Sequence, residues 1–222
     1  MSPAPLTDQL AELSGLLGQM CRTAAAAMQH ATIALLDGRG RLAEKVISDD
    51  AEVDVLRARV EVVATEALLF HAPVAGDLRT VVSAIRSAGD IERMGDLALH
   101  VAEAARRRYP STAVPPEVAP AFDEMGRLAV QLAIKAAEVA RTRNVLLAVE
   151  LDVDDDVMDV LHQEMFGVLM HPTWRHGVAA AVDITLLARY YERYADHAVA
   201  VARQTVYAVT GQNEPVTNRS GR

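Results

Sequence analysis

Aromatic, cysteine and basic residues are scarce in this chain, and each shortage excludes a class of protein. Aromatics make up 4% of the 222 residues and hydrophobic residues 51%, so alanine and leucine supply most of the apolar mass and favour helices over strands. The single cysteine, Cys21, excludes an intramolecular disulfide or a cysteine zinc cluster and is typical of a reducing compartment. With 22 basic and 30 acidic residues, the net charge of −8 argues against a nucleic-acid partner.

Long apolar runs are missing as well. No run approaches the ~18 residues that a membrane span needs. The first residues, MSPAPLTDQL, lack the basic segment followed by an apolar core that a secretory signal requires. We therefore expect a cytoplasmic protein that meets a membrane only through partner proteins.

Prolines and glycines are few and clustered, so they mark helix boundaries. The densest cluster, Pro110 to Pro120, lies near the middle of the chain. Elsewhere apolar residues recur every three or four positions, as they do on one face of a helix. The pattern predicts six helices, three on each side of the cluster, at about 6–36, 41–71, 74–108, 117–143, 145–170 and 173–209.

The two halves repeat the same charged pattern. Residues 85–105 match residues 185–205 with an offset of 100, and DDAEVDVL at 49–56 matches DDDVMDVL at 154–161 with an offset of 105. Alanine and leucine align readily by chance, so the acids and arginines carry this argument. We interpret the chain as all-α, with two tandem three-helix bundles from an internal duplication, each burying its own core. The expected parts are a first bundle at 6–110, a second bundle at 116–210 and a disordered tail at 211–222.

The repeat supplies four pairs of carboxylates at i,i+4 spacing. This spacing places both carboxylates on one helix face, ~5–6 Å apart at Cβ, where like charges repel. A hard cation bridged by carboxylate oxygens would compensate for the repulsion, although acidic pairs on helices are usually solvated surface. The candidate metal ligands are Asp50, Asp54, Glu92, Asp96, Asp155, Asp159, Glu192 and Asp196.

These segments resemble the PhoU family of phosphate-signalling proteins. The resemblance is carried by ERMGDLALHVA at 92–102 and ERYADHAVAVA at 192–202, each preceded by an acidic D-x-x-x-D helix, and by PVAGDLR at 73–79. It spans roughly residues 10–210. The chain departs from the pattern at PTWRHGVAAAV, which stands where a second PVAGDLR would be, and at His197, which follows the second-half motif in place of leucine.

The resemblance implies a fold, a set of ligands and a role. It implies two three-helix bundles whose eight candidate acids bear divalent or trivalent metal ions of the iron or zinc class, and it implies no catalysis. The implied role is negative regulation of the phosphate-starvation response and of phosphate uptake, which maintains intracellular phosphate homeostasis. Its partners would be the ATPase of the phosphate ABC transporter and a sensor histidine kinase, and we expect a homodimer.

Other interpretations remain open. Asp159 and His162 form a D-x-x-H that echoes the E-x-x-H of ferritin-like bundles, so a carboxylate-bridged di-metal helical enzyme is the alternative function. A plain helical scaffold with solvated acids is another. The last predicted helix is rich in tyrosine, which suits a protein interface or core packing equally. If it is an interface, Tyr190, Arg193 and Tyr194 are its candidate contacts.

Overall fold

Every regular element in the described part of the chain, residues 4–212, is an α-helix in the computed structural model. The all-α prediction is therefore confirmed, and Gly211 and Gln212 follow the last helix without regular structure. The predicted disordered tail lies, from residue 213 onward, outside the described residues. The helices are α1 (Leu6–Asp37), α2 (Gly40–Asp49), α3 (Ala51–His71), α4 (Ala75–Arg108), α5 (Ala119–Thr142), α6 (Val145–Met170) and α7 (Gly177–Thr210).

The second predicted helix is interrupted at one residue, Asp50. Asp50 keeps helical dihedral angles, with φ −54° and ψ −37°, so the chain bends between α2 and α3 without forming a loop. The physical cause lies just before it, where the Ser48 hydroxyl donates a hydrogen bond to the Lys45 carbonyl at 2.9 Å. Serine and aspartate side chains compete in this way with the regular backbone bonds of a helix interior.

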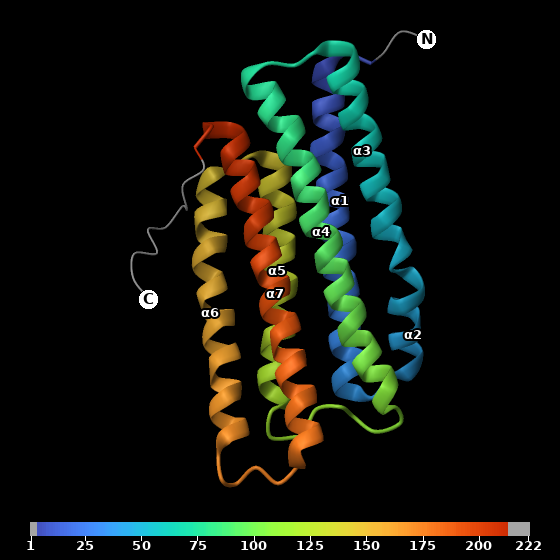
Figure 1. Cartoon of the computed structure of the whole chain (residues 1–222), viewed down its shortest axis with the longest axis vertical. Coiled ribbons are helices and arrows are strands. Elements are labelled where there is room, and N and C mark those ends of the chain that lie inside the picture. The colour runs from blue at the N-terminus through green and yellow to red at the C-terminus, as the bar shows by residue number, and fades with distance from the viewer. Residues whose placement is uncertain (1–3, 213–222) are drawn as a thin grey trace.

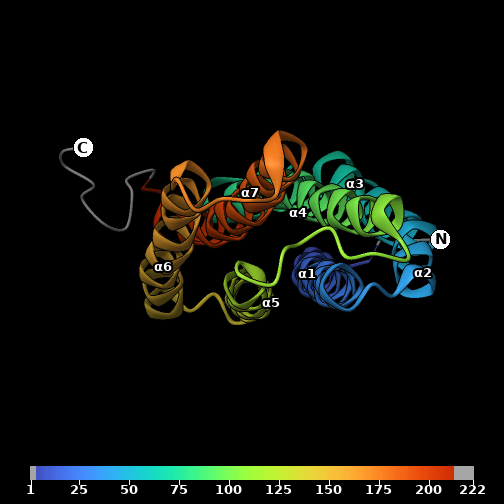
Figure 2. The same ribbon diagram turned by 90° about the horizontal axis from the view of Figure 1, so that it is seen from below.

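With the interrupted α2 and α3 counted as one helix, the helices form two groups of three that lie side by side (Figures 1 and 2). In the first group α1 packs against α2, α3 and α4, and in the second α5, α6 and α7 pack together. The groups meet where α1 contacts α5 and where α4 contacts α7. These four helices occupy the centre, whereas α3 and α6 lie at opposite edges (Figure 2).

The two groups share one hydrophobic core, so the expectation that each half buries its own core is wrong. Buried apolar residues from all seven described helices form a single cluster. Small residues at the junction explain why. Gly18 of α1 lies against the backbone of Ala137 in α5, and Gly126 of α5 lies against Thr32 in α1, so the two helices approach closely.

A buried hydrogen bond ties α1 to α7 in the same region. The Thr32 hydroxyl donates to the Met28 carbonyl at 2.8 Å, so the Tyr191 hydroxyl, 2.8 Å from Thr32 Oγ1, acts as the donor to Thr32. Tyr194 is also fully buried, and the expectation that it contacts a partner is wrong. Tyr190 is half-buried and packs on His100 of α4. The tyrosines of α7 therefore serve mainly the core.

The tight junction gives a prediction for Gly126→Ala. A Cβ at residue 126 would lie 2.7 Å from Thr32 Oγ1, and Thr32 cannot move without losing its bonds to Met28 and Tyr191. Overpacking costs about 1–3 kcal/mol, which outweighs the gain of about 1 kcal/mol from replacing glycine by alanine in a helix. Urea unfolding should show a net loss of stability.

Gly89→Ala on α4 is the matched control, because a Cβ at residue 89 would meet no atom within 4 Å. That variant should gain up to about 1 kcal/mol from helix propensity alone. A Gly126→Ala variant that is as stable as the wild type would contradict the close approach of α1 and α5.

Candidate functional site

The predicted acidic residues fall into two groups, one in each half. In the first half Asp50 comes from the bend before α3, Asp54 comes from the first turn of α3, and Glu92 and Asp96 come from α4. The second-half group is Asp155 and Asp159 of α6 with Glu192 and Asp196 of α7. Each group lies between two neighbouring helices, α3 and α4 or α6 and α7, as the repeat predicts.

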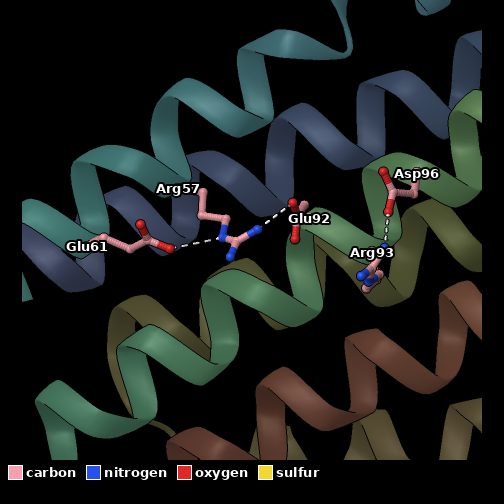
Figure 3. Close-up of polar contacts among 5 residues, drawn as sticks. All are labelled: Arg57, Glu61, Glu92, Arg93 and Asp96. Atoms are coloured by element: carbon pink, nitrogen blue, oxygen red, sulfur yellow. Dashed lines mark hydrogen bonds and ion pairs between the residues drawn. The ribbon is translucent and has the colours of Figure 1, made fainter.

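Two arginines hold the α4 acids of the first group (Figure 3). Arg57 of α3 forms an ion pair with Glu92, and its Nε also donates to Glu61 at 3.2 Å. Arg93 donates to Asp96 at 2.7 Å. Arginines of the same half therefore pair with two of the four acids of this group.

Asp50 occupies the bend between α2 and α3, beneath Gly95 of α4. A Cβ at residue 95 would lie 3.7 Å from the Asp50 carboxylate, an ordinary contact distance, so α4 passes close to the bend. Burial raises the pKa of the Asp50 carboxyl, and the negative charges of Asp96 and Asp54 raise it further. Asp50 is thus the member of the first group whose charge is least compensated.

Glu192 is the central residue of the second group. One of its oxygens accepts a hydrogen bond from Arg189, one turn earlier on α7. The other oxygen, Oε2, is buried and has no hydrogen-bond partner among the described residues. Burial raises the pKa of Glu192, and the charge of Asp196 adds to that effect.

Asp196 and His162 complete the surroundings of Glu192. Asp196 remains exposed on one side, yet partial burial and then the charge of Asp159 raise its pKa. Burial, and then the Arg189 charge, lower the pKa of His162 and favour its neutral form. Asp155, one turn before Asp159, is buried on α6.

In the two halves, the arginine that compensates the negative charge of the glutamate comes from different helices. Arg57 of α3 pairs with Glu92, whereas the residue that corresponds to Arg57 in the second half is His162. The second half instead uses Arg189, which corresponds to Gly89 of the first half. Sequence reasoning missed Arg57. The offset of 105 that aligns the acids also pairs Arg57 with His162, and this could have directed attention to it.

A hydrogen bond and an ion pair join the halves outside the acidic groups. The His197 Nδ1 lies 3.0 Å from the Asp90 carboxylate of α4, so its ring contacts the other half. Arg108 of α4 pairs with Asp183 of α7. His197, a departure from the repeat, therefore belongs to the junction between α4 and α7.

The second group suits a hard cation better than the first. The unpartnered Oε2 of Glu192, with Asp159 and Asp196 nearby, provides oxygen ligands whose mutual repulsion a cation would relieve. In the first group Arg57 and Arg93 already hold Glu92 and Asp96. As the side chains stand, no set of three or more His, Cys, Asp or Glu residues within 4–212 could hold a metal ion, so metal binding stays a prediction.

The placement of the two acidic groups differs from that of the metal ligands in a ferritin-like enzyme, the alternative function. A ferritin-like di-metal centre draws its ligands from four helices that face one another. Here each acidic group comes from only two helices, and the groups lie in different halves.

Among the helices of residues 4–212, none combines the length and the apolar character that crossing a bilayer requires.

Comparisons with known proteins identify relatives over nearly the whole chain. The family model for the PhoU domain matches residues 17–105 and again residues 122–205, once in each half. A protein of Mycobacterium tuberculosis named phosphate-specific transport system accessory protein PhoU homolog 2 is 54% identical over 204 residues, which cover 92% of this chain and 96% of that protein. The Mycobacterium leprae protein named PhoU homolog 1 is 52% identical and covers 92% of each chain.

A solved structure supports the fold. The crystal structure of PhoU from Pseudomonas aeruginosa matches with a TM-score of 0.83, covering 94% of this chain and 100% of that one. The sequence identity is 22%, so this likeness concerns the fold alone.

The raised pKa of Asp196 gives a prediction for metal-free protein. Because the shift is upward, the folded state holds the proton more tightly than the unfolded state, and the charged carboxylate destabilises the fold. This loss of stability is absent below the ordinary pKa of aspartate. It develops as the pH rises from the ordinary pKa to the raised one. Asp196→Asn should therefore raise the melting temperature at pH 7 in a chelating buffer. The gain in the free energy of unfolding should be less than about 1 kcal/mol, because water screens the exposed side.

The gain should shrink as the pH falls toward 3.8, the ordinary pKa of aspartate, where wild-type Asp196 is itself largely protonated. Glu66→Gln, at an exposed position of α3, is the control that should leave the melting temperature unchanged. A lower melting temperature for Asp196→Asn in chelator would show that Asp196 stabilises the metal-free fold.

Proposed function

Because the chain belongs to the PhoU family, we propose that it is an accessory regulator of phosphate-specific transport that represses the phosphate-starvation response when phosphate is plentiful. The observation that carries this proposal is the double family match, at 17–105 and 122–205, together with 54% identity to a protein named for that transport system. Under this proposal the protein maintains phosphate homeostasis by restraining phosphate uptake.

In this proposal the protein acts without catalysis, as a cytoplasmic homodimer. It links the ATPase of the phosphate ABC transporter to a sensor histidine kinase, so that transporter activity reaches the kinase through protein contacts. The shared core supports this role, because two halves that bury one apolar cluster respond as a single body. The His197–Asp90 hydrogen bond and the Arg108–Asp183 ion pair further restrain α4 against α7. Under this proposal, a partner that binds at one edge of the molecule can then affect the other edge through the shared core.

We also propose that the acidic group of α6 and α7 holds a divalent or trivalent cation of the iron or zinc class. When bound, such a cation would supply positive charge that relieves the repulsion among the carboxylates. Glu192 would contribute its unpartnered oxygen, and Asp159 and Asp196 would contribute carboxylates from the same surroundings. The first group is expected to bind more weakly, because a cation there must displace Arg57 or Arg93.

Metal binding predicts a reversal in the effect of Asp196→Asn. Stripped wild-type protein should melt at a higher temperature once Zn²⁺ or Fe³⁺ is added, with a gain of about 2.7 kcal/mol at a free metal concentration 100 times the dissociation constant. Asp196→Asn, which loses a ligand, should gain much less. Calorimetry with and without metal, alongside Glu66→Gln, tests this. Equal gains in wild type and Asp196→Asn would reject this cation site.

Deletion of the gene tests the regulatory role itself. The deletion strain should express phosphate-uptake genes in phosphate-rich medium, because repression requires the adaptor, and the wild-type gene supplied in trans should restore repression. Transcript levels measured at high and low phosphate distinguish this from a general growth defect. Equal phosphate-dependent expression in the deletion strain and its parent would reject the proposed function.

Complementation with Asp196→Asn separates the regulatory role from the cation site. If that variant folds and restores repression, the cation site is not needed for regulation, whatever the calorimetry shows.

A further inference from the structure

Helix α6 has a face that nothing in the described chain covers. It lies at one edge of the molecule and packs against α5 and α7, so its opposite side faces solvent (Figures 1 and 2). A helix in this position normally carries polar residues on its outer side and apolar residues on its inner side. In α6 both sides carry apolar residues.

The outer side carries a line of four large apolar residues. Leu146, Val153, Val157 and Val160 are spaced by seven, four and three residues, which places them along one face of the helix. Their exposed fractions are 75%, 53%, 48% and 54%. We call this line the outer stripe of α6. Single exposed apolar residues are common on proteins, but a contiguous line of them indicates a contact surface.

The duplicated first half shows that the fold does not require the stripe. The offset of 105 that aligns the acidic motifs also aligns the outer positions of α6 with those of α2 and α3. By that offset Leu146, Val153 and Val157 correspond to Arg41, Ser48 and Glu52, which are all exposed. Only Val160 has an apolar counterpart, Val55. The same scaffold therefore presents polar residues on one edge and apolar residues on the other.

The charge on α6 indicates the chemistry of the occupant. Counted along its 26 residues, α6 has seven acidic residues and no lysine or arginine. With ~100° of rotation per residue, Glu150 and Asp154 border one side of the stripe, Asp156 borders the other, and Glu164 lies in line with it. Lys135 of α5 lies 2.6 Å from Asp154 and 3.9 Å from Glu150, which leaves an excess of negative charge on the face.

This charge selects among the possible occupants. A second α6 would bring two acidic helices together, and an anionic lipid surface or a nucleic acid would be repelled in the same way. A helix with apolar residues on one side and lysines or arginines at its borders would match both the stripe and the acids. Laying the apolar side of an amphipathic helix on an apolar surface is a recurrent mode of peptide recognition.

We propose that the outer stripe of α6 is the docking surface for a basic amphipathic helix of a partner protein. The partner's apolar residues pack on Leu146, Val153 and Val157, and its basic residues face Glu150 and Glu164. This goes beyond the proposed function, because the family match assigns no surface and no partner chemistry to α6. It also does not require the partner to belong to phosphate signalling.

The test uses the full chain and a designed probe. The probe is a labelled 18-residue helical peptide with leucines along one face and lysines at its borders, and fluorescence anisotropy measures its binding. Val153→Ser/Val157→Glu gives α6 the residues that the first half has at the corresponding positions. We expect this variant to bind the probe at least tenfold more weakly than wild type, and wild-type binding to weaken as salt rises.

The control variant, Val55→Ser/Val62→Ser, removes two exposed valines from α3, the opposite edge. It should bind the probe as wild type does, and a peptide with glutamate in place of lysine should not bind at all. A second α6 variant, Glu150→Lys/Glu164→Lys, should also weaken binding at least tenfold while leaving the valines in place. Circular dichroism and melting temperature confirm that each variant is folded.

Other outcomes overturn the proposal. Equal loss of binding in the α3 control would show that the probe recognises exposed apolar residues in general and not the stripe. A wild-type dimer that Val153→Ser/Val157→Glu converts to monomer in sedimentation would make the stripe an interface between copies of this chain. Binding to phosphatidylglycerol vesicles that depends on the valines would make it a lipid contact.

Discussion

The close packing of α1 against α5, and of α4 against α7, is the constraint on which the rest of the structure depends. Between α1 and α5 the approach is closest at Gly126, where a Cβ would collide with Thr32 of α1. Because these central helices bury one core, the two repeats behave as a single body with two edges, α3 and α6. The acidic groups lie between the central helices α4 and α7 and those edges. Their positions therefore follow from the packing at the centre.

Duplication placed equivalent acids in both halves, but the negative charge of these acids is compensated differently in each half. In the first half an arginine from the edge helix, Arg57, reaches across to Glu92. In the second half His162 stands at the corresponding position, and Arg189 binds only one oxygen of Glu192. An arginine keeps its charge at all physiological pH values, whereas a neutral histidine contributes none. The second half therefore retains a buried carboxylate oxygen that has no hydrogen-bond partner among the described residues, and this difference between the halves would be missed if the repeats were treated as identical.

The sequence predicted the parts of this structure that depend on local periodicity. Apolar residues every three or four positions indicated the helices, and the repeated charges indicated which helices carry the acids. The bend at Asp50 was missed because it depends on the side-chain bond from Ser48 to Lys45 within an otherwise periodic segment. The shared core and the burial of Tyr194 were missed because both depend on how the halves pack together. A helix at the centre of the assembly has few exposed sides, and α7 packs against α4, α5 and α6.

Helix α6 violates the ordinary rule for an edge helix, and the pattern of the violation is informative. The inner side buries Leu151 and Met158 in the core, which the fold requires. The outer side adds Leu146, Val153 and Val157. The fold does not require apolar residues there, because the corresponding positions of the first half carry Arg41, Ser48 and Glu52. Exposed valines keep apolar surface in contact with water and gain no packing, so they lower solubility unless something covers them. A feature that breaks a local rule without serving the fold is where function is expected. In α6 that feature lies on the same helix as Asp159, so the edge that faces a partner also carries part of the acidic group.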